Sequence, residues 1–459
     1  MCNFTDEKCR CDMKKMDRRG FIQRSAAGAG LMAMSPLEVM AAKKSGKRVE
    51  TRLPVEGYLS EPAREIPVVA SADVVVVGGG PAGFAAAVSA ARQGSSVVLI
   101  ERYNHLGGLW TGGLVLPVLS THGAGHGDVW TKVVHGISDD VCGRLFGMGM
   151  AVNEKNPTID SEACKFVLDE MCREARVRTI FFSTAAEVIM KGSAIEAVVI
   201  ETKSGRLAVR CKVVVDCSGD GDVMAWSGVS FREIKYHIGL IARLGNTDRV
   251  DKGAEGFEKQ HVGGKTPIPG VTMLHMRGEE QQDGLDVFNL SRLQQKFRKE
   301  IWERVEGIRQ KPGYEKVFLL ETAPQLGVRV TRALDAIHTV TLEESMTRTV
   351  FDDTIGMSGG SDPIPYKGQM VPTEKRPCWQ IPYRSLVPRG CDNLLVAGRC
   401  FGFEEALAWD AREIGTCFVT GQAAGTAAAM AADRRCSVAE VDIANLQERL
   451  RKQHVTLSI

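Results

Sequence analysis

The sequence has no uninterrupted apolar run of the roughly twenty residues that a membrane-spanning helix needs, so we expect no stable membrane insertion. It also lacks strong charge of either sign, because 58 Lys and Arg residues and 56 Asp and Glu residues leave a formal net charge of +2. No basic cluster stands outside the N-terminal segment, which disfavours nucleic acid as a partner. Among 13 cysteines, no two have Cys-x-x-Cys spacing. Metal and iron–sulfur centres need clustered ligands, so we predict no metal site and the spacing does not support an iron–sulfur cluster.

The first 42 residues differ in composition from the rest of the chain. Arg18 and Arg19 precede Phe21 and a weakly apolar stretch rich in glycine and alanine, and a small-residue cleavage site ends at Ala41. This pattern resembles a twin-arginine export signal, although a disordered basic N-terminus can also contain an arginine pair. We expect a signal peptide over residues 1–42, the export machinery as a partner, a periplasmic or secreted location, and a linker over residues 43–65.

Residues 73–101 have the pattern of a dinucleotide-binding unit. A β-branched run at 73–77 predicts a buried parallel strand, and glycines with Gly-x-Gly-x-x-Gly spacing, a small-residue helix and a second apolar strand at 97–100 follow. The glycines allow a tight turn, a close approach to pyrophosphate and close helix packing, while an acid about twenty residues on accepts from ribose hydroxyls. The alternative is a flexible glycine loop. The predicted cofactor-binding residues here are Gly78, Gly80, Pro81, Ala82, Gly83, Glu101 and Arg102.

Three further segments extend the predicted site, and the first of them favours FAD over NAD. Residues 106–113 form a second glycine cluster that would let the backbone run beside a long, flat cofactor. Residues 216–222 follow an apolar strand and offer an acid for ribityl or ribose hydroxyls, although an acidic surface turn has the same composition. An apolar strand that ends in glycine and arginine recurs at 392–399. These segments add Gly107, Gly108, Thr111, Gly219, Asp220, Gly398 and Arg399 to the predicted site.

Small residues from 421 to 428 predict a helix whose N-terminal dipole would lie near the flavin ring and stabilise its reduced, anionic form. We therefore assign Gly421, Gln422 and Ala423 to the cofactor site; a tightly packed core helix is the alternative, and both can hold. Further expected elements are helices at 162–176, 285–307 and 438–452, the last capped by Ser437, and strands at 179–182, 194–202, 207–215 and 317–320.

The βαβ pattern is lost between residues 226 and 385, and this loss divides the chain. We expect one FAD-binding domain built from residues 66–225 and 386–435, with an inserted substrate domain at 226–385. A C-terminal helix occupies the remaining 436–459.

Several spaced motifs together resemble a known family. They are residues 78–83, 106–108, 216–222, 323–329, 381–384, 393–399 and 421–428, and they resemble the FAD-dependent oxidoreductases related to the flavoprotein subunit of heterodisulfide reductase. More distantly, the chain is similar to fumarate reductase flavoproteins. The resemblance implies an α/β fold: a Rossmann-like FAD-binding domain of the glutathione-reductase type, with an inserted mixed α+β substrate domain. A histidine can bind flavin covalently in fumarate reductases, but the surroundings of His105 do not match, so we expect non-covalent FAD.

The expected function is an exported FAD-dependent oxidoreductase that transfers hydride between flavin and an alcohol, sugar or organic acid. Arg329 and Arg412 are candidate carboxylate or oxyanion binders, and His122 or His126 is the candidate base. Blander interpretations are a solvated strand edge for Arg329, an ion pair of Arg412 with a nearby acid at 404, 405 or 410, and solvated loop histidines. An FAD-binding electron-transfer protein that serves a redox partner, or a structural protein with a flavin fold, remains an alternative. The sequence identifies neither the substrate nor the electron acceptor.

Overall fold

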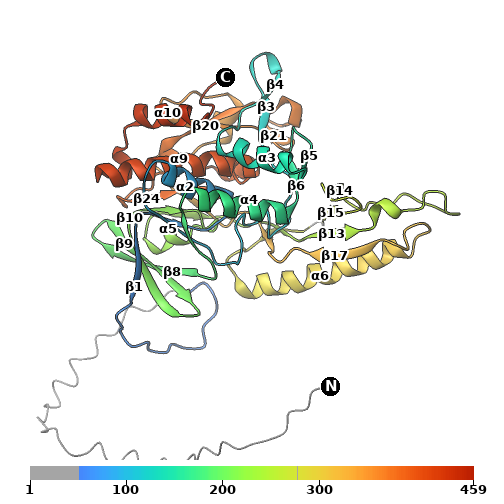
Figure 1. The fold of residues 1–459 in the computed structure, drawn as a ribbon, viewed down its shortest axis with the longest axis horizontal. Coiled ribbons are helices and arrows are strands. Elements are labelled where there is room, and N and C mark those ends of the chain that lie inside the picture. The colour runs from blue at the N-terminus through green and yellow to red at the C-terminus, as the bar shows by residue number, and fades with distance from the viewer. Residues whose placement is uncertain (1–50, 276–277) are drawn as a thin grey trace, which may run out of the picture. The chain divides into compact units, whose positions relative to one another are not determined.

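A seven-stranded sheet organises the part of the chain that the computed structural model describes, residues 51–275 and 278–459 (Figure 1). Five strands run parallel in the order β7-β2-β1-β10-β24, and β9 and β8 continue antiparallel from the first half of β10. The predicted signal peptide lies outside the described residues. The strands are β1 (Val68–Val77), β2 (Val97–Ile100), β7 (Arg178–Ile180), β8 (Thr184–Lys191), β9 (Ala194–Thr202), β10 (Gly205–Asp216) and β24 (Leu394–Val396).

The last four residues of β1 are buried on both faces, as the β-branched run predicts. Val74 and Val76 belong to one hydrophobic cluster together with the helices, whereas Val75 and Val77 belong to a second cluster on the side of β8 and β9. Successive side chains of a strand point to opposite faces, so one apolar run serves two cores. The Rossmann-like, α/β part of the predicted fold is therefore present.

Helices α2 (Pro81–Arg92) and α9 (Ile414–Arg434) pack against each other on one face of the sheet. A Cβ atom on Gly421 would lie 2.1 Å from the Ala82 carbonyl oxygen, and one on Gly425 would lie 2.1 Å from that of Ala86. The two backbones thus touch where α9 has no side chain. The sequence predicted a helix around 421–428, but α9 begins seven residues earlier, so Gly421 lies in its interior.

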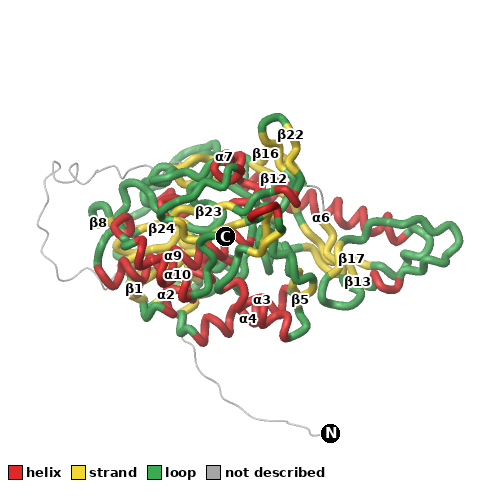
Figure 2. The backbone as a smooth tube through the Cα atoms, turned by 90° about the horizontal axis from the view of Figure 1, so that it is seen from above, coloured by secondary structure: helices red, strands yellow, loops and turns green. Residues whose placement is uncertain are grey.

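A second sheet with one long helix forms a lobe, defined here as strands β13, β14, β15 and β17 with α6 (Figure 2). One face of α6 buries Leu293, Phe297, Ile301, Val305 and Ile308 at helical spacing. The predicted helix at 285–307 and strand at 317–320 are confirmed within about two residues. The bounds are β13 (Ile241–Gly245), β14 (Gly264–Lys265), β15 (Thr272–His275), β17 (Phe318–Thr322) and α6 (Val287–Arg309).

Smaller elements make up the rest of the fold. No helix among the described residues is long and apolar enough to cross a membrane. The remaining strands are β3 (His122–Ala124), β4 (Trp130–Lys132), β5 (Ala151–Val152), β6 (Thr158–Ile159), β11 (Phe231–Glu233), β12 (Tyr236–Gly239), β16 (Glu279–Gln282), β18 (Gly327–Val328), β19 (Arg332–Leu334), β20 (Thr354–Ser358), β21 (Ile364–Tyr366), β22 (Gln369–Val371) and β23 (Trp379–Pro382). The remaining α-helices are α3 (Ile137–Gly147), α4 (Ser161–Glu174), α5 (Asp222–Trp226), α7 (Leu342–Met346), α8 (Ala408–Ala411) and α10 (Ile443–Lys452).

The sequence analysis missed one strand of the main sheet and misplaced the start of the last helix. Strand β8 was missed, because it contains two alanines, a glutamate and a lysine among its eight residues and its strand conformation comes from pairing with β9. The last helix begins at Ile443 rather than at residue 438. Ser437 caps a short 3₁₀ turn, the chain then extends at Val441, and the side chain of Asp442 caps α10.

Candidate active site

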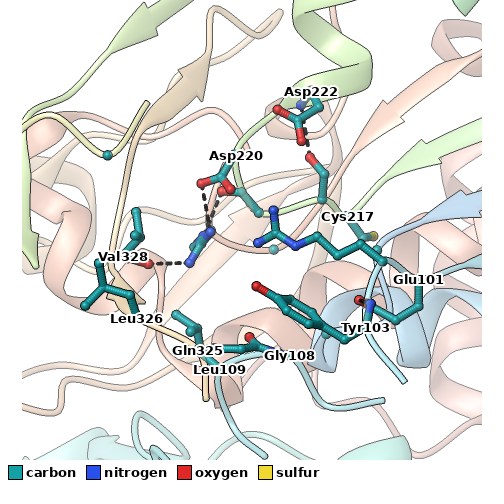
Figure 3. Close-up of a pocket in the computed structure, with 18 of the residues that line it drawn as sticks. Glu101, Tyr103, Gly108, Leu109, Cys217, Asp220, Asp222, Gln325, Leu326 and Val328 are labelled. Carbon is teal, nitrogen blue, oxygen red and sulfur yellow. Dashed lines mark hydrogen bonds and ion pairs between the residues drawn. The ribbon is translucent and has the colours of Figure 1, made fainter. Parts of the chain in front are cut away.

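The carboxyl ends of β1, β2, β10 and β24 meet at one cavity of about 670 Å³ (Figure 3). Ligands of open α/β sheets bind at this edge, and the volume is in the range of small-molecule and cofactor sites. Thirteen of the predicted site residues line it: Gly78, Gly80, Pro81, Ala82, Glu101, Arg102, Gly108, Gly219, Asp220, Arg329, Gly398, Arg399 and Arg412. The sheet therefore brings together segments more than 300 residues apart in the sequence.

The glycine turn has the geometry of a phosphate cradle. Gly78 has φ of +96°, and a Cβ there would lie 2.4 Å from the Cys217 carbonyl oxygen. At Gly80 a Cβ would meet no protein atom within 4 Å and would project into open space beside the cavity. Helix α2 starts at Pro81 without a side-chain cap, so the free N–H groups of its first turn can bind an anion. These residues fit the pyrophosphate of FAD.

Glu101 lines the cavity at the end of β2. Its Oε2 accepts a hydrogen bond of 2.6 Å from the Gly79 N–H, and its Oε1 accepts one of 2.8 Å from the Tyr103 N–H. The carboxylate is buried, with 5% of its surface exposed. A carboxylate has about four acceptor positions, so two bonds to the backbone hold Glu101 in place and leave capacity for ribose hydroxyls.

Arg399 is bonded entirely to protein atoms. Its Nε donates to the Gly219 carbonyl over 2.7 Å, one terminal nitrogen donates to Asp220 Oδ1 over 2.8 Å, and the other contacts the Val328 carbonyl. Figure 3 marks the contacts to Asp220 and Val328 as dashed lines. Asp220 also accepts from the Thr331 hydroxyl over 2.9 Å. The side chains of Arg399 and Asp220 thus have protein hydrogen-bond partners before any ligand binds.

Arg329, Arg412 and Glu413 form a charged group that lines the same cavity. Arg412 pairs with Glu413 at 3.1 Å, and both side chains are almost fully buried. This corrects the expected alternative, because Asp410 pairs with Arg376 and Glu404 accepts from the Leu342 N–H. Arg412 also lies over the Trp409 ring, 5.0 Å from its centroid.

Arg329 has no hydrogen bond and no ion pair with any described residue, and its Nε is buried without a partner. Burial and then the neighbouring Arg412 lower the pKa of Arg329 to about 10. Burial raises the pKa of Glu413, while Arg412 and Arg329 act in the opposite direction. Buried charges normally have partners, so this end of the cavity carries positive charge that an anion would neutralise.

Several predicted residues do not line the cavity. His122 lies on β3 with its ring stacked on Trp130, and His126 is hydrogen-bonded to the Ile459 carbonyl. The structure therefore does not bring either of these candidate bases to the cavity. The glycine loop that contains them pairs with β4 and turns away from the ends of the parallel strands.

Gly421, Gln422 and Ala423 also stand away from the cavity. Gly421 touches the backbone of α2, and Gln422 accepts from the Ile137 N–H over 3.0 Å and donates to Gln453. The N-terminus of α9 that faces the cavity is at Ile414, which lines it. The structure therefore does not bring these three residues to the cavity, because the helix starts earlier than its small-residue segment suggested.

Gly83, Gly107 and Thr111 act behind the cavity wall. A Cβ on Gly83 would lie 1.7 Å from the Gly78 carbonyl oxygen, so its role is the close packing that the spacing predicts. The Thr111 hydroxyl donates to the Leu106 carbonyl over 2.5 Å and lies 3.2 Å from His105 Nδ1. His105 is buried in this network and is not a cavity-lining residue.

The sequence analysis missed Glu413 and the helix α6 wall. Glu413 directly follows Arg412 and precedes α9, and an acid next to a candidate cationic residue was the available signal. Helix α6 contributes Ser291, Gln294 and Arg298 to the cavity, which no local motif indicates. No group of three or more His, Cys, Asp or Glu residues within the described part of the chain could hold a metal ion.

Comparison with known proteins gives a family match over most of the chain. Residues 73–239 and 242–450 match the model of the family described as FAD dependent oxidoreductase. A segment is 29% identical over 173 residues to digeranylgeranylglycerophospholipid reductase of Methanocella arvoryzae, covering 34% of this chain and 42% of that protein. Another is 53% identical over 53 residues to NADH oxidase of Thermoanaerobacter brockii, covering 12% of this chain and 8% of that protein. The matches thus span less than half of these curated relatives.

Among solved structures, a geranylgeranyl bacteriochlorophyll reductase-like protein from Thermoplasma acidophilum is 16% identical, with 84% of each chain covered and a TM-score of 0.42. A p-nitrophenol 4-monooxygenase from Pseudomonas putida is 12% identical, with 85% of this chain and 87% of that chain covered and a TM-score of 0.43. The family match agrees with the glycine turn, the acid after β2 and the returning strand β24. The chain belongs to the FAD dependent oxidoreductase family and is an FAD-binding oxidoreductase enzyme.

Proposed function

We propose that this enzyme transfers hydride between flavin and a small organic acid whose carboxylate binds Arg329. The observation that carries the proposal is the partly buried Arg329, which has no hydrogen bond or ion pair with any described residue. An unpaired guanidinium in a cavity is costly unless a ligand supplies the opposite charge. A forked carboxylate–arginine pair would supply that charge and also orient the substrate.

When bound, FAD supplies a two-electron carrier at its ring nitrogen N5. The residues of the chain then have two tasks. Arg329 holds the substrate carboxylate, and Glu413 takes the proton of the substrate hydroxyl during oxidation or returns it during reduction. Burial raises the pKa of Glu413, which brings this carboxyl closer to the range of a general base. Arg412 keeps Glu413 in place through their ion pair.

The test is anaerobic reduction of the holoenzyme by a panel of hydroxy acids, each compared with its neutral ester, followed by loss of flavin absorbance. We expect the acids to reduce the flavin and the esters to do so at least tenfold more slowly. Equal rates for acids and esters would contradict the role of Arg329. Reduction by no small molecule would favour the electron-transfer alternative.

Glu413→Gln tests the proposed base without a change of shape. We expect a loss in the flavin reduction rate on the order of 100-fold or more with FAD retained. In the unsubstituted enzyme the rate should fall as pH drops through the Glu413 pKa, which lies above its ordinary value of 4.5. A substituted enzyme with an unchanged rate and pH profile would exclude Glu413 as the base.

Export and domain roles complete the proposal. We propose that residues 1–42 direct twin-arginine export to the periplasm or beyond, a route that carries folded proteins, and that residues 226–385 act as the substrate domain. Replacing Arg18 and Arg19 together by lysine should leave a folded, FAD-loaded protein in the cytoplasm, as measured by cell fractionation. Unchanged export would mean that the pair is not the signal.

A further inference from the structure

Helix α6 reaches from the lobe to the cofactor cavity. Ser291, Gln294 and Arg298 line the cavity together with Gly80 and Pro81 of the glycine turn. Their spacing of three and four residues places them on one stripe of the helix, beside the face that packs Leu293 and Phe297 into the lobe. The stripe is therefore held in place by the apolar face next to it.

Gln294 and Arg298 carry polar groups without protein partners, whereas the Ser291 hydroxyl donates to the Val287 carbonyl over 2.8 Å. Gln294 Nε2 is buried without a hydrogen-bond partner among the described residues. Arg298 makes no hydrogen bond or ion pair with them either, in contrast to Arg292 and Lys296 on another face of α6, which both contact Glu279. Buried amide donors in proteins are normally satisfied, so a ligand acceptor in the cavity is the missing partner for Gln294.

The charged residues of the cavity indicate that the ligand group beside this stripe is a diphosphate. Three carboxylates, Glu101, Asp220 and Asp222, line this part of the cavity, and only two guanidiniums do so from the sheet side. One of these, Arg399, is already bonded to Asp220 and to carbonyls, and the other, Arg102, lies over the Tyr103 ring, 5.0 Å from its centroid. A further arginine, Arg332, pairs with Asp222 at 3.2 Å, so Arg332 and Arg399 are both neutralised by carboxylates. A diphosphate bound here would need additional positive charge, and the unpaired Arg298 on α6 is available to supply it.

We propose that the Ser291–Gln294–Arg298 stripe of α6 binds the diphosphate of FAD, so that the lobe and the sheet hold the cofactor together. Backbone N–H groups of the α2 N-terminus bind the phosphates from the sheet, and the Gln294 amide and Arg298 guanidinium bind them from the lobe. Loss of the stripe then loosens the cofactor without disturbing the fold, because neither polar group is bonded to the protein.

The test measures release of FAD from the holoenzyme, followed by the rise in flavin fluorescence after dilution. Arg298→Gln should release FAD about tenfold faster than the unsubstituted enzyme, and Gln294→Glu, which puts a carboxylate beside the phosphates, should release it faster still. Lys299→Gln is the matched control: it removes the same charge from a solvent-exposed position about 100° around α6 from Arg298, where Lys299 contacts Glu303, and should change the rate less than twofold. Added salt should narrow the difference between Arg298→Gln and the unsubstituted enzyme.

Three outcomes would overturn the proposal. One is release from Arg298→Gln at the unsubstituted rate. Another is equal acceleration by Lys299→Gln, which would indicate a general charge effect of the helix. The third is unchanged FAD release together with weaker binding of added ADP to Arg298→Gln, which would assign the stripe to a separate nucleotide. Matching far-ultraviolet circular dichroism spectra of the holoenzymes show that the fold is intact in each comparison.

Discussion

Two arginines that line the cavity are held in opposite ways. Arg399 is bonded to Asp220 and to the carbonyls of Gly219 and Val328. Arg329 has no bonded partner among the described residues, and its neighbours include a second arginine, Arg412. The first arrangement is complete before any ligand binds and shapes the cofactor cradle. The second is incomplete, and an incomplete charge group is where a substrate contributes binding energy.

The largest effect should come from the turn itself. Gly83→Ala would place a Cβ 1.7 Å from the Gly78 carbonyl oxygen, a backbone clash that no side-chain rotation relieves. We expect little folded protein, as measured by soluble yield and circular dichroism. Gly80→Leu is the matched variant, because a Cβ at this position would meet no protein atom within 4 Å; it should fold but lose FAD, as shown by the flavin-to-protein absorbance ratio. A yellow Gly80→Leu protein would contradict the cradle assignment.

Arg399→Met should cost about 3–5 kcal/mol of unfolding free energy, because it leaves the part-buried Asp220 without its cation and two carbonyls without a donor. Denaturant unfolding measures the loss. If Arg399→Met is as stable as the unsubstituted protein, the hydrogen bonds of Arg399 do not stabilise the fold, and the contrast with Arg329 does not hold.

Arg329→Met should show the opposite pattern. The fold and FAD content should remain, because no bonded partner is lost, while kcat/KM for an acidic substrate should fall on the order of 100-fold, about 3 kcal/mol. Steady-state kinetics and the same denaturant titration measure both quantities on one preparation. A large loss of unfolding free energy would mean that Arg329, like Arg399, stabilises the fold.

The smallest effect concerns pH. Burial raises the pKa of Asp222 from 3.8 to about 6, with Asp220 and Asp216 acting in the same direction. The folded state then favours the protonated carboxyl of Asp222. The stability that this protonation contributes is fully present below pH 3.8 and is lost as pH rises through about 6. Asp222→Asn should be more stable than the unsubstituted protein above that range, by about 1–2 kcal/mol after solvent screening, and equal to it below. Urea unfolding across this pH range checks the sign.

The sequence predicted the cofactor half of the site better than the substrate half. Gly78, Gly80 and Glu101 belong to a local motif in which strand, turn, helix and acid follow each other, so spacing alone places them. Arg329 and Glu413 lie on different segments that only the fold brings to one cavity. His122 and His126 illustrate the converse: their glycine-rich loop suggested chemistry, but it forms a local hairpin with β4 and bridges to Pro377, and neither histidine lines the cavity.

The predicted boundaries of an element were wrong where a local sequence pattern covered only part of that element. The small-residue run from 421 to 428 shows where α9 touches α2, not where α9 starts, because Cys417 and Phe418 are also buried in the same helix. The α6 stripe was not predicted because its local sequence pattern does not show what the helix packs beside. Ser291, Gln294 and Arg298 look like an ordinary solvated helix face until the cavity beside them is known.

The glycine contacts between α2 and α9 also bear on how the protein is made. Helix α2 leaves the ribosome more than 300 residues before α9, and β10 likewise waits for β24. At about 5–20 residues per second, the first half of the FAD domain remains without its packing partner for tens of seconds of synthesis. The α2 surface at Ala82 and Ala86 is exposed during that time and needs protection from premature association. Cofactor insertion therefore follows completion of the chain, and a ribosome that stops early releases a product that cannot form the cavity.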